Sequence, residues 1–407
     1  MIQRICLVFL SLWSLALGQD RDVPYVLLIS FDGFRADYLD WYPTPHFHAL
    51  AEAGVRAEHM QPVYVTKTFP NHYTLATGMY IENHGLIDNY FYDEKLDETY
   101  RLSDRTKVED ARFYGGEPIW VTAEQQGVKS ASMFWVGSEA PVAGLQPSIW
   151  KRYDHHMPFF DRVDSVAAWF SLPENRRPHL VTLYFHEPDE TSHHFGVRSA
   201  ETEQKVAALD SLLGYIMRTM VALPIYDRLN IIVVSDHGMV DLSPEKIIQF
   251  PEKIDLTGIT QERSGPFSFL YPVKGWRARR LVRQLNRIPH LNAYRKADIP
   301  KRYHYRNHYR IKDVLLVADE GWSIPNLKRA HDPEYLASLT RGATHGYDNQ
   351  LRSMQAIFIA DGPAFKNAYQ RAEIQNIMVY PIIAKILGLI PNPQADGKVT
   401  AVKDLFR

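Results

Sequence analysis

Five short apolar runs, each followed by a polar cluster, constrain the fold of this chain more than any other feature. They are Tyr25–Ser30, Ser132–Val136, Leu180–Phe185, Asn230–Ser235 and Ala356–Ala360. Continuous β-branched and aromatic runs of this length are typical of strands that are covered on both faces. Helix-like stretches lie between them, at Pro45–Ala53, Asn71–Thr77 and Ala200–Met220. This alternation predicts an α/β fold with a mainly parallel central sheet flanked by helices.

The segment 251–330 has a different pattern. An apolar run (Phe267–Val273) precedes a basic helical stretch (Arg277–Arg287), a stretch rich in Tyr, Arg and His (Tyr294–Lys312), and a second apolar run (Val314–Val317). We expect a small α/β insertion here, a lid or cap between two parts of a catalytic domain, 24–250 and 331–407. The basic stretch is more simply a solvated face than a phosphate contact. The formal net charge of the chain is -1, so we expect no duplex nucleic acid as a partner.

The N-terminus resembles a secretory signal peptide. Arg4 precedes an apolar run, Ile5–Leu17, and small residues follow near Gly18, so we expect cleavage after residues 1–18. A buried N-terminal helix is the alternative, and the run is short for a transmembrane segment. The only cysteine, Cys6, would be removed with this segment. An exported protein without disulfides is typical of a bacterial periplasm or cell surface, so we predict a secreted or periplasmic bacterial protein.

Acidic and histidine side chains gather where the predicted strands end. In open α/β sheets, ligands bind outside the carboxyl ends of the strands. The candidates are Asp32 after the first strand, Asp189 and His193 after the third, Asp236 and His237 after the fourth, and His345 before the last. Asp and neutral His together suit Zn²⁺ better than Mn²⁺, Ca²⁺ or Mg²⁺, and six donors match two metals better than one. Any single Asp after a strand is more simply a turn or helix-cap residue; the full set predicts a two-metal site.

Thr68 is the candidate nucleophile. It lies in the stretch Lys67–His72, where Pro70 suits the first turn of the helix that follows. At the N-terminus of that helix, backbone N–H groups and the helix dipole favour an anion. Coordination to Zn²⁺ would convert the weakly nucleophilic hydroxyl into an alkoxide. Without the metal residues nearby, Thr68 would be interpreted as a helix cap.

These motifs resemble those of the nucleotide pyrophosphatase/phosphodiesterase family, within the alkaline phosphatase superfamily. The matching stretches are Ser30–Arg35, Lys67–His72, Thr77–Gly78, His84–Gly85, Asp88–Asn89, Glu187–Asp189, Ser235–Met239 and His345–Asn349. The resemblance spans residues 24–392 and implies an alkaline-phosphatase-like fold. It implies that Asp189, His193 and His345 hold one zinc ion, and that Asp32, Thr68, Asp236 and His237 hold the other. It also implies that Thr68 forms a covalent intermediate and that Asn89 and the Phe69 backbone N–H stabilise the oxyanion.

The resemblance also suggests the substrate. Phe69 and Tyr153 match the two aromatic residues that stack a nucleotide base in the family, so we expect hydrolysis of nucleotide diester or anhydride bonds to nucleoside 5′-monophosphates. The stretch 137–159 argues against a long-chain lipid but not against a choline-type glycerophosphodiester, which aromatic side chains can also bind. A phosphomonoesterase is disfavoured because only Lys67 could supply the extra positive charge. A surface protein that binds nucleotides or metals without turnover is the non-enzymatic alternative.

Overall fold

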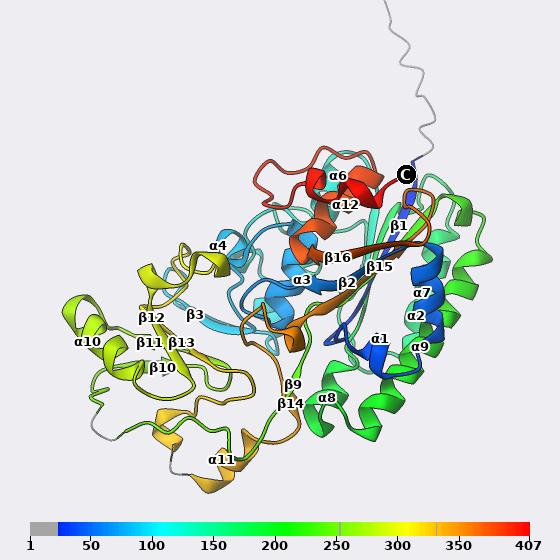
Figure 1. Cartoon of the computed structure of the whole chain (residues 1–407). Helices are drawn as coiled ribbons and strands as arrows, with labels where there is room; N and C mark the ends of the chain where they lie inside the picture. The colour runs from blue at the N-terminus through cyan, green and yellow to red at the C-terminus, as the bar shows by residue number, and fades with distance from the viewer. Residues whose placement is uncertain (1–22, 252–253, 331) are drawn as a thin grey trace, which may run out of the picture.

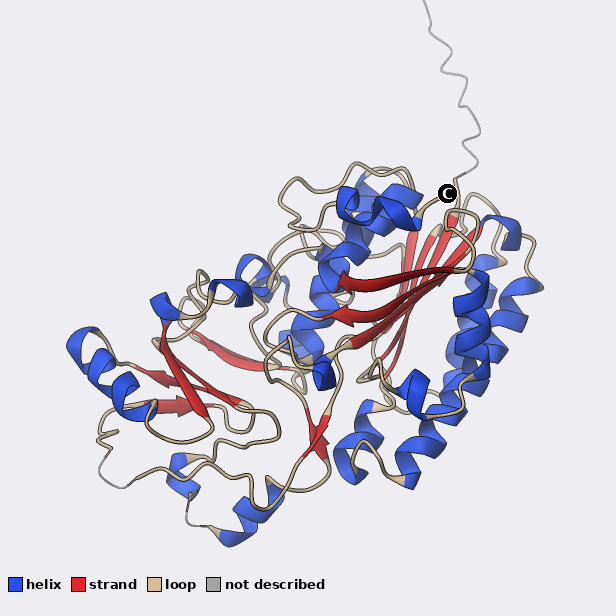
Figure 2. Ribbon diagram, viewed as in Figure 1, coloured by secondary structure: helices blue, strands red, loops and turns tan. Residues whose placement is uncertain are grey.

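A mixed sheet of eight strands forms the centre of the computed structural model, which describes residues 23–251, 254–330 and 332–407. The predicted signal peptide, 1–18, lies outside the described residues. The strands lie in the order β16-β2-β15-β8-β1-β7-β5-β6 (Figures 1 and 2). Their bounds are β1 Tyr25–Phe31, β2 Val55–Gln61, β5 Ser130–Met133, β6 Ile149–Lys151, β7 Leu180–Phe185, β8 Leu229–Val234, β15 Ala356–Asp361 and β16 Tyr369–Gln375.

The five predicted strands are five neighbours in this sheet. All pairs are parallel except those that β15 forms with β2 and β8, which are antiparallel. Both ends of one predicted strand were wrong: the run predicted at Ser132–Val136 becomes strand Ser130–Met133. The strand stops because Phe134 has a φ of 71°, in the left-handed region, where an extended ladder cannot continue.

Helices cover both faces of the sheet, as the continuous apolar runs require. Along β1, Val26 and Leu28 join one core with α3, α6 and α12, whereas Leu27 and Ile29 join a second core with α2, α7 and α9. The helices of this part are α1 Tyr38–Trp41, α2 Pro45–Ala53, α3 Thr68–Thr77, α4 Ile81–His84, α5 Arg105–Val108, α6 Ile119–Gln125, α7 Phe159–Phe170, α8 Asp189–Phe195, α9 Ala200–Val221 and α12 Val379–Ile386. Among the described residues, no helix has the length and apolar character that crossing a membrane requires.

The insertion forms a second sheet beside the first. Its strands are β10 Thr260–Glu262, β11 Phe267–Tyr271, β12 Leu291–Arg295 and β13 Val314–Ala318, in the antiparallel order β10-β11-β13-β12, and its helices are α10 Gly275–Leu285 and α11 Pro333–Ser338. The chain leaves the catalytic part at β9 (Val240–Asp241) and returns at β14 (Ala343–Thr344), which pair with each other. The predicted segment 251–330 lies between these two strands in the sequence.

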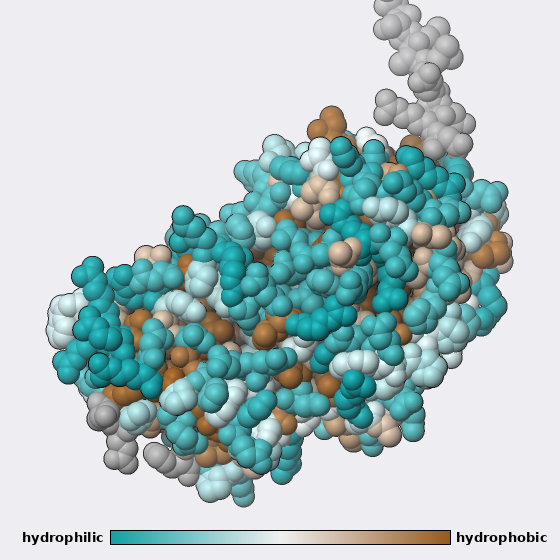
Figure 3. Space-filling model, in the orientation of Figure 1, coloured by the Kyte–Doolittle hydropathy of each residue, from teal (hydrophilic) through white to brown (hydrophobic). Residues whose placement is uncertain are grey.

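The two faces of the small sheet bury different partners. Phe269 and Leu315 belong to the same core as the central sheet, whereas Leu270 and Leu316 pack with Leu281 of α10. A hairpin of the catalytic part, β3 (Tyr90–Asp93) and β4 (Glu98–Arg101), also contacts the insertion. The shared core favours a fixed extension of the catalytic part over a swinging lid. Figure 3 shows a mostly hydrophilic face, with hydrophobic residues visible mainly around the insertion.

Candidate active site

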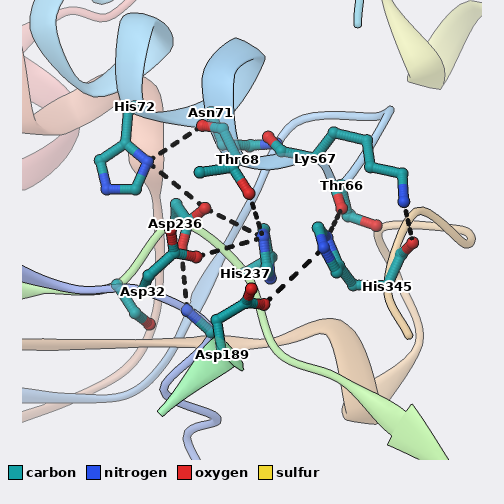
Figure 4. Close-up of polar contacts among 12 residues, drawn as sticks. Asp32, Thr66, Lys67, Thr68, Asn71, His72, Asp189, Asp236, His237 and His345 are labelled. Atoms are coloured by element: carbon teal, nitrogen blue, oxygen red, sulfur yellow. Dashed lines mark hydrogen bonds and ion pairs between the residues drawn. The ribbon is translucent and has the colours of Figure 1, made fainter. Parts of the chain in front are cut away.

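The six predicted metal ligands meet at one edge of the central sheet. Asp32 follows β1, Asp189 opens α8 directly beyond β7, and the Asp236–His237 pair follows β8. His345 follows β14 and precedes β15. Because β15 runs antiparallel to β8, its beginning lies at the same edge as the ends of the parallel strands. The strand directions therefore bring together side chains that are distant in the sequence (Figure 4).

These residues form two clusters. In the Asp32 cluster, which comprises Asp32, Asp236 and His237, His237 Nε2 lies 3.0 Å from Asp236 Oδ2 and 3.6 Å from Asp32 Oδ1. In the Asp189 cluster, which comprises Asp189, His193 and His345, the two His Nε2 atoms lie 3.5 and 3.7 Å from the Asp189 carboxylate. His194, which follows His193 directly in the sequence, points elsewhere: its Nδ1 contacts the Glu190 carbonyl, and its side chain is exposed.

The three histidines are oriented as metal ligands would be. Nδ1 of His193, His237 and His345 donates to the backbone carbonyls of Ala343, Gly238 and Thr66, at 2.8, 2.9 and 2.8 Å. A carbonyl only accepts, so in each ring Nδ1 carries the proton and Nε2 presents its lone pair to the cluster.

The carboxylates also fit divalent cations. One buried oxygen of Asp32 (Oδ1), Asp189 (Oδ1) and Asp236 (Oδ2) lacks a hydrogen-bond partner among the described residues. Burial, and then the charges of Asp236 and Asp189, raise the pKa of Asp32 well above its ordinary value. Buried, mutually repelling carboxylates with free oxygens are costly unless positive charge is supplied. The donor set therefore fits divalent metal ions.

Thr68 begins α3 beside the Asp32 cluster. The cap position belongs to Lys67, which has extended backbone angles, so Thr68 is the first helical residue and not the cap. Its Oγ1 lies 3.3 Å from His237 Nε2. The hydroxyl thus lies both at a helix N-terminus and against a cluster of metal-ligand type.

Asn89 is placed differently from expectation. Its Oδ1 accepts a hydrogen bond of 2.9 Å from the Phe69 N–H, so the two groups expected to donate to an oxyanion instead contact each other. Asn89 Nδ2 has no hydrogen-bond partner within the described chain. Asn89 Nδ2 is therefore free to donate a hydrogen bond to a ligand beside Thr68.

A cavity of about 320 Å³ opens next to Thr68. Phe69 and Tyr153, the two residues expected to stack a base, both line it. Phe134 packs edge-on against Tyr153 with ring centroids 5.3 Å apart. Arg105 also lines the cavity, where it forms an ion pair with Glu139.

Three contributors were missed from the sequence. Tyr184 faces the site from β7 and donates a hydrogen bond of 2.6 Å to Asp32 Oδ2. A Tyr inside a buried apolar strand needs such a partner, and this requirement could have identified it. Arg105, in the short helix α5, and Glu139, in a loop, carry no comparable signal, because only the tertiary fold brings them together.

Lys67 does not reach the nucleophile. Its Nζ donates to the His345 carbonyl at 2.6 Å, on the far side of the Asp189 cluster from Thr68 (Figure 4). Burial lowers the pKa of Lys67 to about 8. Lys67 is therefore not placed to bind the additional charge of a phosphate monoester at Thr68.

Comparison with known proteins agrees with this geometry. The chain matches the type I phosphodiesterase / nucleotide pyrophosphatase family over residues 26–348. It is 37% identical over 397 residues to venom phosphodiesterase CdcPDE of Crotalus durissus collilineatus, covering 94% of this chain but 46% of that protein. It is 34% identical to human ectonucleotide pyrophosphatase/phosphodiesterase family member 5, covering 95% of this chain and 78% of that protein. It is 35% identical to the mouse bis(5'-adenosyl)-triphosphatase enpp4, covering 98% of this chain and 86% of that protein.

Solved structures show the same fold. Human ectonucleotide pyrophosphatase/phosphodiesterase 5 superposes with a TM-score of 0.86 at 33% identity, covering 94% of this chain and 100% of that one. The murine protein, as an inactive threonine-to-alanine variant in complex with AMP, matches equally well.

These relatives come from animals, so the expectation of a bacterial type finds no support in them. The chain spans about half the length of the venom phosphodiesterases that it matches. It belongs to the nucleotide pyrophosphatase/phosphodiesterase family.

Proposed function

We propose that this protein is a metal-dependent hydrolase that cleaves nucleotide phosphodiester and phosphoanhydride bonds to nucleoside 5′-monophosphates. The observation that carries the proposal is the position of Thr68. Its hydroxyl lies at a helix N-terminus, against the Asp32 cluster, and at the wall of a cavity whose aromatic lining includes Phe69 and Tyr153.

In this proposal, Thr68 Oγ1 attacks phosphorus, the bond to the leaving-group oxygen breaks, and a phosphothreonine intermediate forms that water then hydrolyses. Two Zn²⁺ ions would be held by the Asp32 cluster with Thr68 and by the Asp189 cluster, where they would supply positive charge to the hydroxyl and the phosphate oxygens. The positive end of the α3 dipole favours the anionic phosphate, and Asn89 Nδ2 donates to an oxygen that becomes more negative during the attack.

A nucleotide is the substrate that the cavity supports best. Phe69 and Tyr153 offer aromatic faces on its wall, and stacking on such faces accepts any base. A murine relative is described in complex with AMP, and a mouse relative is named a bis(5'-adenosyl)-triphosphatase. The same aromatic faces could hold a choline headgroup, so choline diesters belong in the test.

The test is a turnover panel on purified protein: a nitrophenyl ester of a nucleoside 5′-monophosphate, a dinucleoside polyphosphate, nitrophenyl phosphate and glycerophosphocholine. We expect the nucleotide diesters to be fastest. Preference for nitrophenyl phosphate or for glycerophosphocholine would refute the proposed substrate.

Thr68→Ala tests the nucleophile. We expect it to retain bound zinc and to lose turnover by roughly 10³-fold or more, whereas Thr68→Ser keeps a hydroxyl and part of the activity. Chelation should abolish turnover, and Zn²⁺ should restore it better than Mg²⁺. A Thr68→Ala protein with unchanged turnover would show that the attacking group is wrong.

We further propose that residues 1–18 direct secretion and are removed. Expression of the full chain followed by N-terminal sequencing checks this. A mature protein that still begins at Met1 would contradict it.

A further inference from the structure

The insertion extends one side chain to the segment that carries Asn89. Arg263 follows β10 in the turn before β11, and its Nε lies 2.7 Å from Asp88 Oδ2. The centre of its guanidinium lies 5.7 Å from the centre of the Tyr90 ring, within the range of a cation–π contact. Asp88 and Tyr90 are the neighbours of Asn89 in the sequence. Arg263 therefore contacts both residues that flank the proposed oxyanion donor.

Arg263 is the ion-pair partner of a buried carboxylate. The Asp88 side chain is fully buried, whereas the Arg263 side chain is 27% exposed. Burial raises the pKa of Asp88, and the strongest opposing influence is the positive charge of Arg263, followed by that of Lys67. The Lys67 ammonium donates to the His345 carbonyl. A buried carboxylate is costly without a nearby positive charge, so the ion pair restrains Asp88 and the backbone that leads into Asn89.

The backbone of Arg263 is held in an unfavourable conformation. Its φ is 77°, in the left-handed region that glycine adopts freely and other residues adopt at a cost. Two contacts hold the turn in this shape: Ser268 Oγ donates to the Arg263 carbonyl at 3.0 Å, and the Gly265 N–H donates to the Ile324 carbonyl at 2.8 Å. Strained residues of this kind are concentrated at functional sites. Here the strained residue places a long cationic side chain against the segment that carries Asn89.

The hydrogen bonds of Asn89 fix only part of its position. Its Oδ1 accepts from the Phe69 N–H at 2.9 Å, and its carbonyl accepts from the Leu102 N–H at 3.0 Å. These bonds hold the end of the side chain and the peptide that follows Asn89. The peptide that precedes Asn89 begins at Asp88, which Arg263 restrains. The three contacts together determine where Asn89 Nδ2 points.

We propose that Arg263 is a positioning residue for the reaction. By holding Asp88 and Tyr90, it keeps Asn89 Nδ2 directed at the phosphoryl oxygen that becomes more negative during the attack by Thr68. Arg263 acts through Asn89, so this role rests on the proposed function. Displacing a catalytic group by about 1 Å can lower the rate by about 10²-fold. We expect Arg263→Ala to lower kcat by roughly 10–100-fold and to leave KM nearly unchanged, because the donor acts mainly in the transition state.

Arg263→Ala and Arg263→Gly separate this role from an effect on stability. Both remove the side chain, but glycine relieves the left-handed strain, so Arg263→Gly should have the higher Tm of the two. Measured with a nitrophenyl nucleotide diester on the full protein, both should lose kcat equally and retain full zinc content. Arg263→Lys should keep most of the kcat, because an ammonium can also pair with Asp88. If kcat instead follows Tm and is retained in Arg263→Gly, Arg263 acts only on stability and the proposal is wrong.

A double-mutant cycle tests whether Arg263 acts through Asn89. Adding Arg263→Ala to Asn89→Ala should lower kcat by less than about 2-fold, because the group that Arg263 positions is already absent. The matched control is Arg302→Ala, which removes another ion pair between the insertion and the catalytic part, formed with Asp348. Its effect on kcat should be the same with and without Asn89.

The outcomes distinguish this proposal from the proposed function. A loss of roughly 10–100-fold from Arg263→Ala in the Asn89→Ala protein would overturn the positioning role, because Arg263 would then act directly on the substrate or on the fold. Failure of the proposed function has a different result: Asn89→Ala alone would leave kcat unchanged, and Arg263 would have no donor to position.

Discussion

The contact between Asn89 and the backbone of Phe69 allows two roles of one side chain to be separated. Asn89 Oδ1 accepts the Phe69 N–H at 2.9 Å, so only Nδ2 remains to donate to a phosphoryl oxygen. Asn89→Asp preserves an acceptor for Phe69 and removes the donor. Asn89→Ala removes both.

The two roles differ in magnitude. Removing one preorganised donor to a developing oxyanion lowers kcat by about 10²–10³-fold, roughly 2.7–4 kcal/mol. Losing the hydrogen bond to Phe69 costs only about 0.5–1.5 kcal/mol. Asn89→Asp also places a negative charge beside an anionic substrate. We therefore expect Asn89→Asp to lose at least as much kcat as Asn89→Ala.

The assay is kcat and KM for a nitrophenyl nucleotide diester, with bound zinc and Tm measured for each variant. Equal zinc content and similar Tm values show that the site is intact. If Asn89→Asp keeps nearly full kcat while Asn89→Ala loses about 10²-fold, Asn89 acts only by positioning Phe69, and the assignment of Nδ2 as an oxyanion donor is refuted.

Three further predictions concern the cavity, the backbone and pH. Tyr153→Ala should raise KM for nucleotide diesters by about 5–150-fold, equivalent to about 1–3 kcal/mol of stacking, and should leave KM for bis-nitrophenyl phosphate nearly unchanged; equal effects on both would argue against base stacking. Gly33→Ala should lower Tm and zinc content, because Gly33 has a φ of 66° and a Cβ there would lie 2.9 Å from the Asp189 side chain; a normal zinc content would show that Asp189 can move aside. Burial lowers the pKa of His84 to about 3, so only the unfolded state binds its proton below about pH 6.5, and stability is lost as pH falls. The free energy of unfolding should fall by about 2 kcal/mol between about pH 7.5 and pH 5 because of His84. Denaturant unfolding at the two pH values should show a smaller loss in His84→Gln, and an identical loss in both proteins would contradict the prediction.

The strands that could be predicted are those whose burial is visible in a short stretch of sequence. β1 and β8 are buried on both faces, so their sequences are apolar apart from Ser30 and Asn230. β2 (Val55–Gln61) and β16 (Tyr369–Gln375) were missed because polar side chains dominate both. β16 lies at the sheet edge, and its pairing with β2 depends on tertiary contacts that no short window of sequence contains.

The residues of the site also separate into those that local sequence predicts and those that it does not. Asp32 and Asp236 follow strands directly, so locating the strands located them. The contact between Asn89 and Phe69 and the ion pair between Arg105 and Glu139 each join a loop residue to a helix that is distant in the sequence, so the sequence contained no local signal for either.

His345 was predicted at the correct edge of the sheet, although the prediction did not include the direction of β15. A residue that precedes a parallel strand lies at the opposite edge from residues that follow one. His345 precedes β15, so it meets Asp189 only because β15 is antiparallel to β8. The same reversal brings β14 back beside β9, closing the insertion at the edge where the ligands lie. His237 therefore lies just before the chain enters the insertion, and His345 lies just after it returns. Because the insertion packs against the central core, it helps to fix the position of the Asp32 cluster relative to the Asp189 cluster.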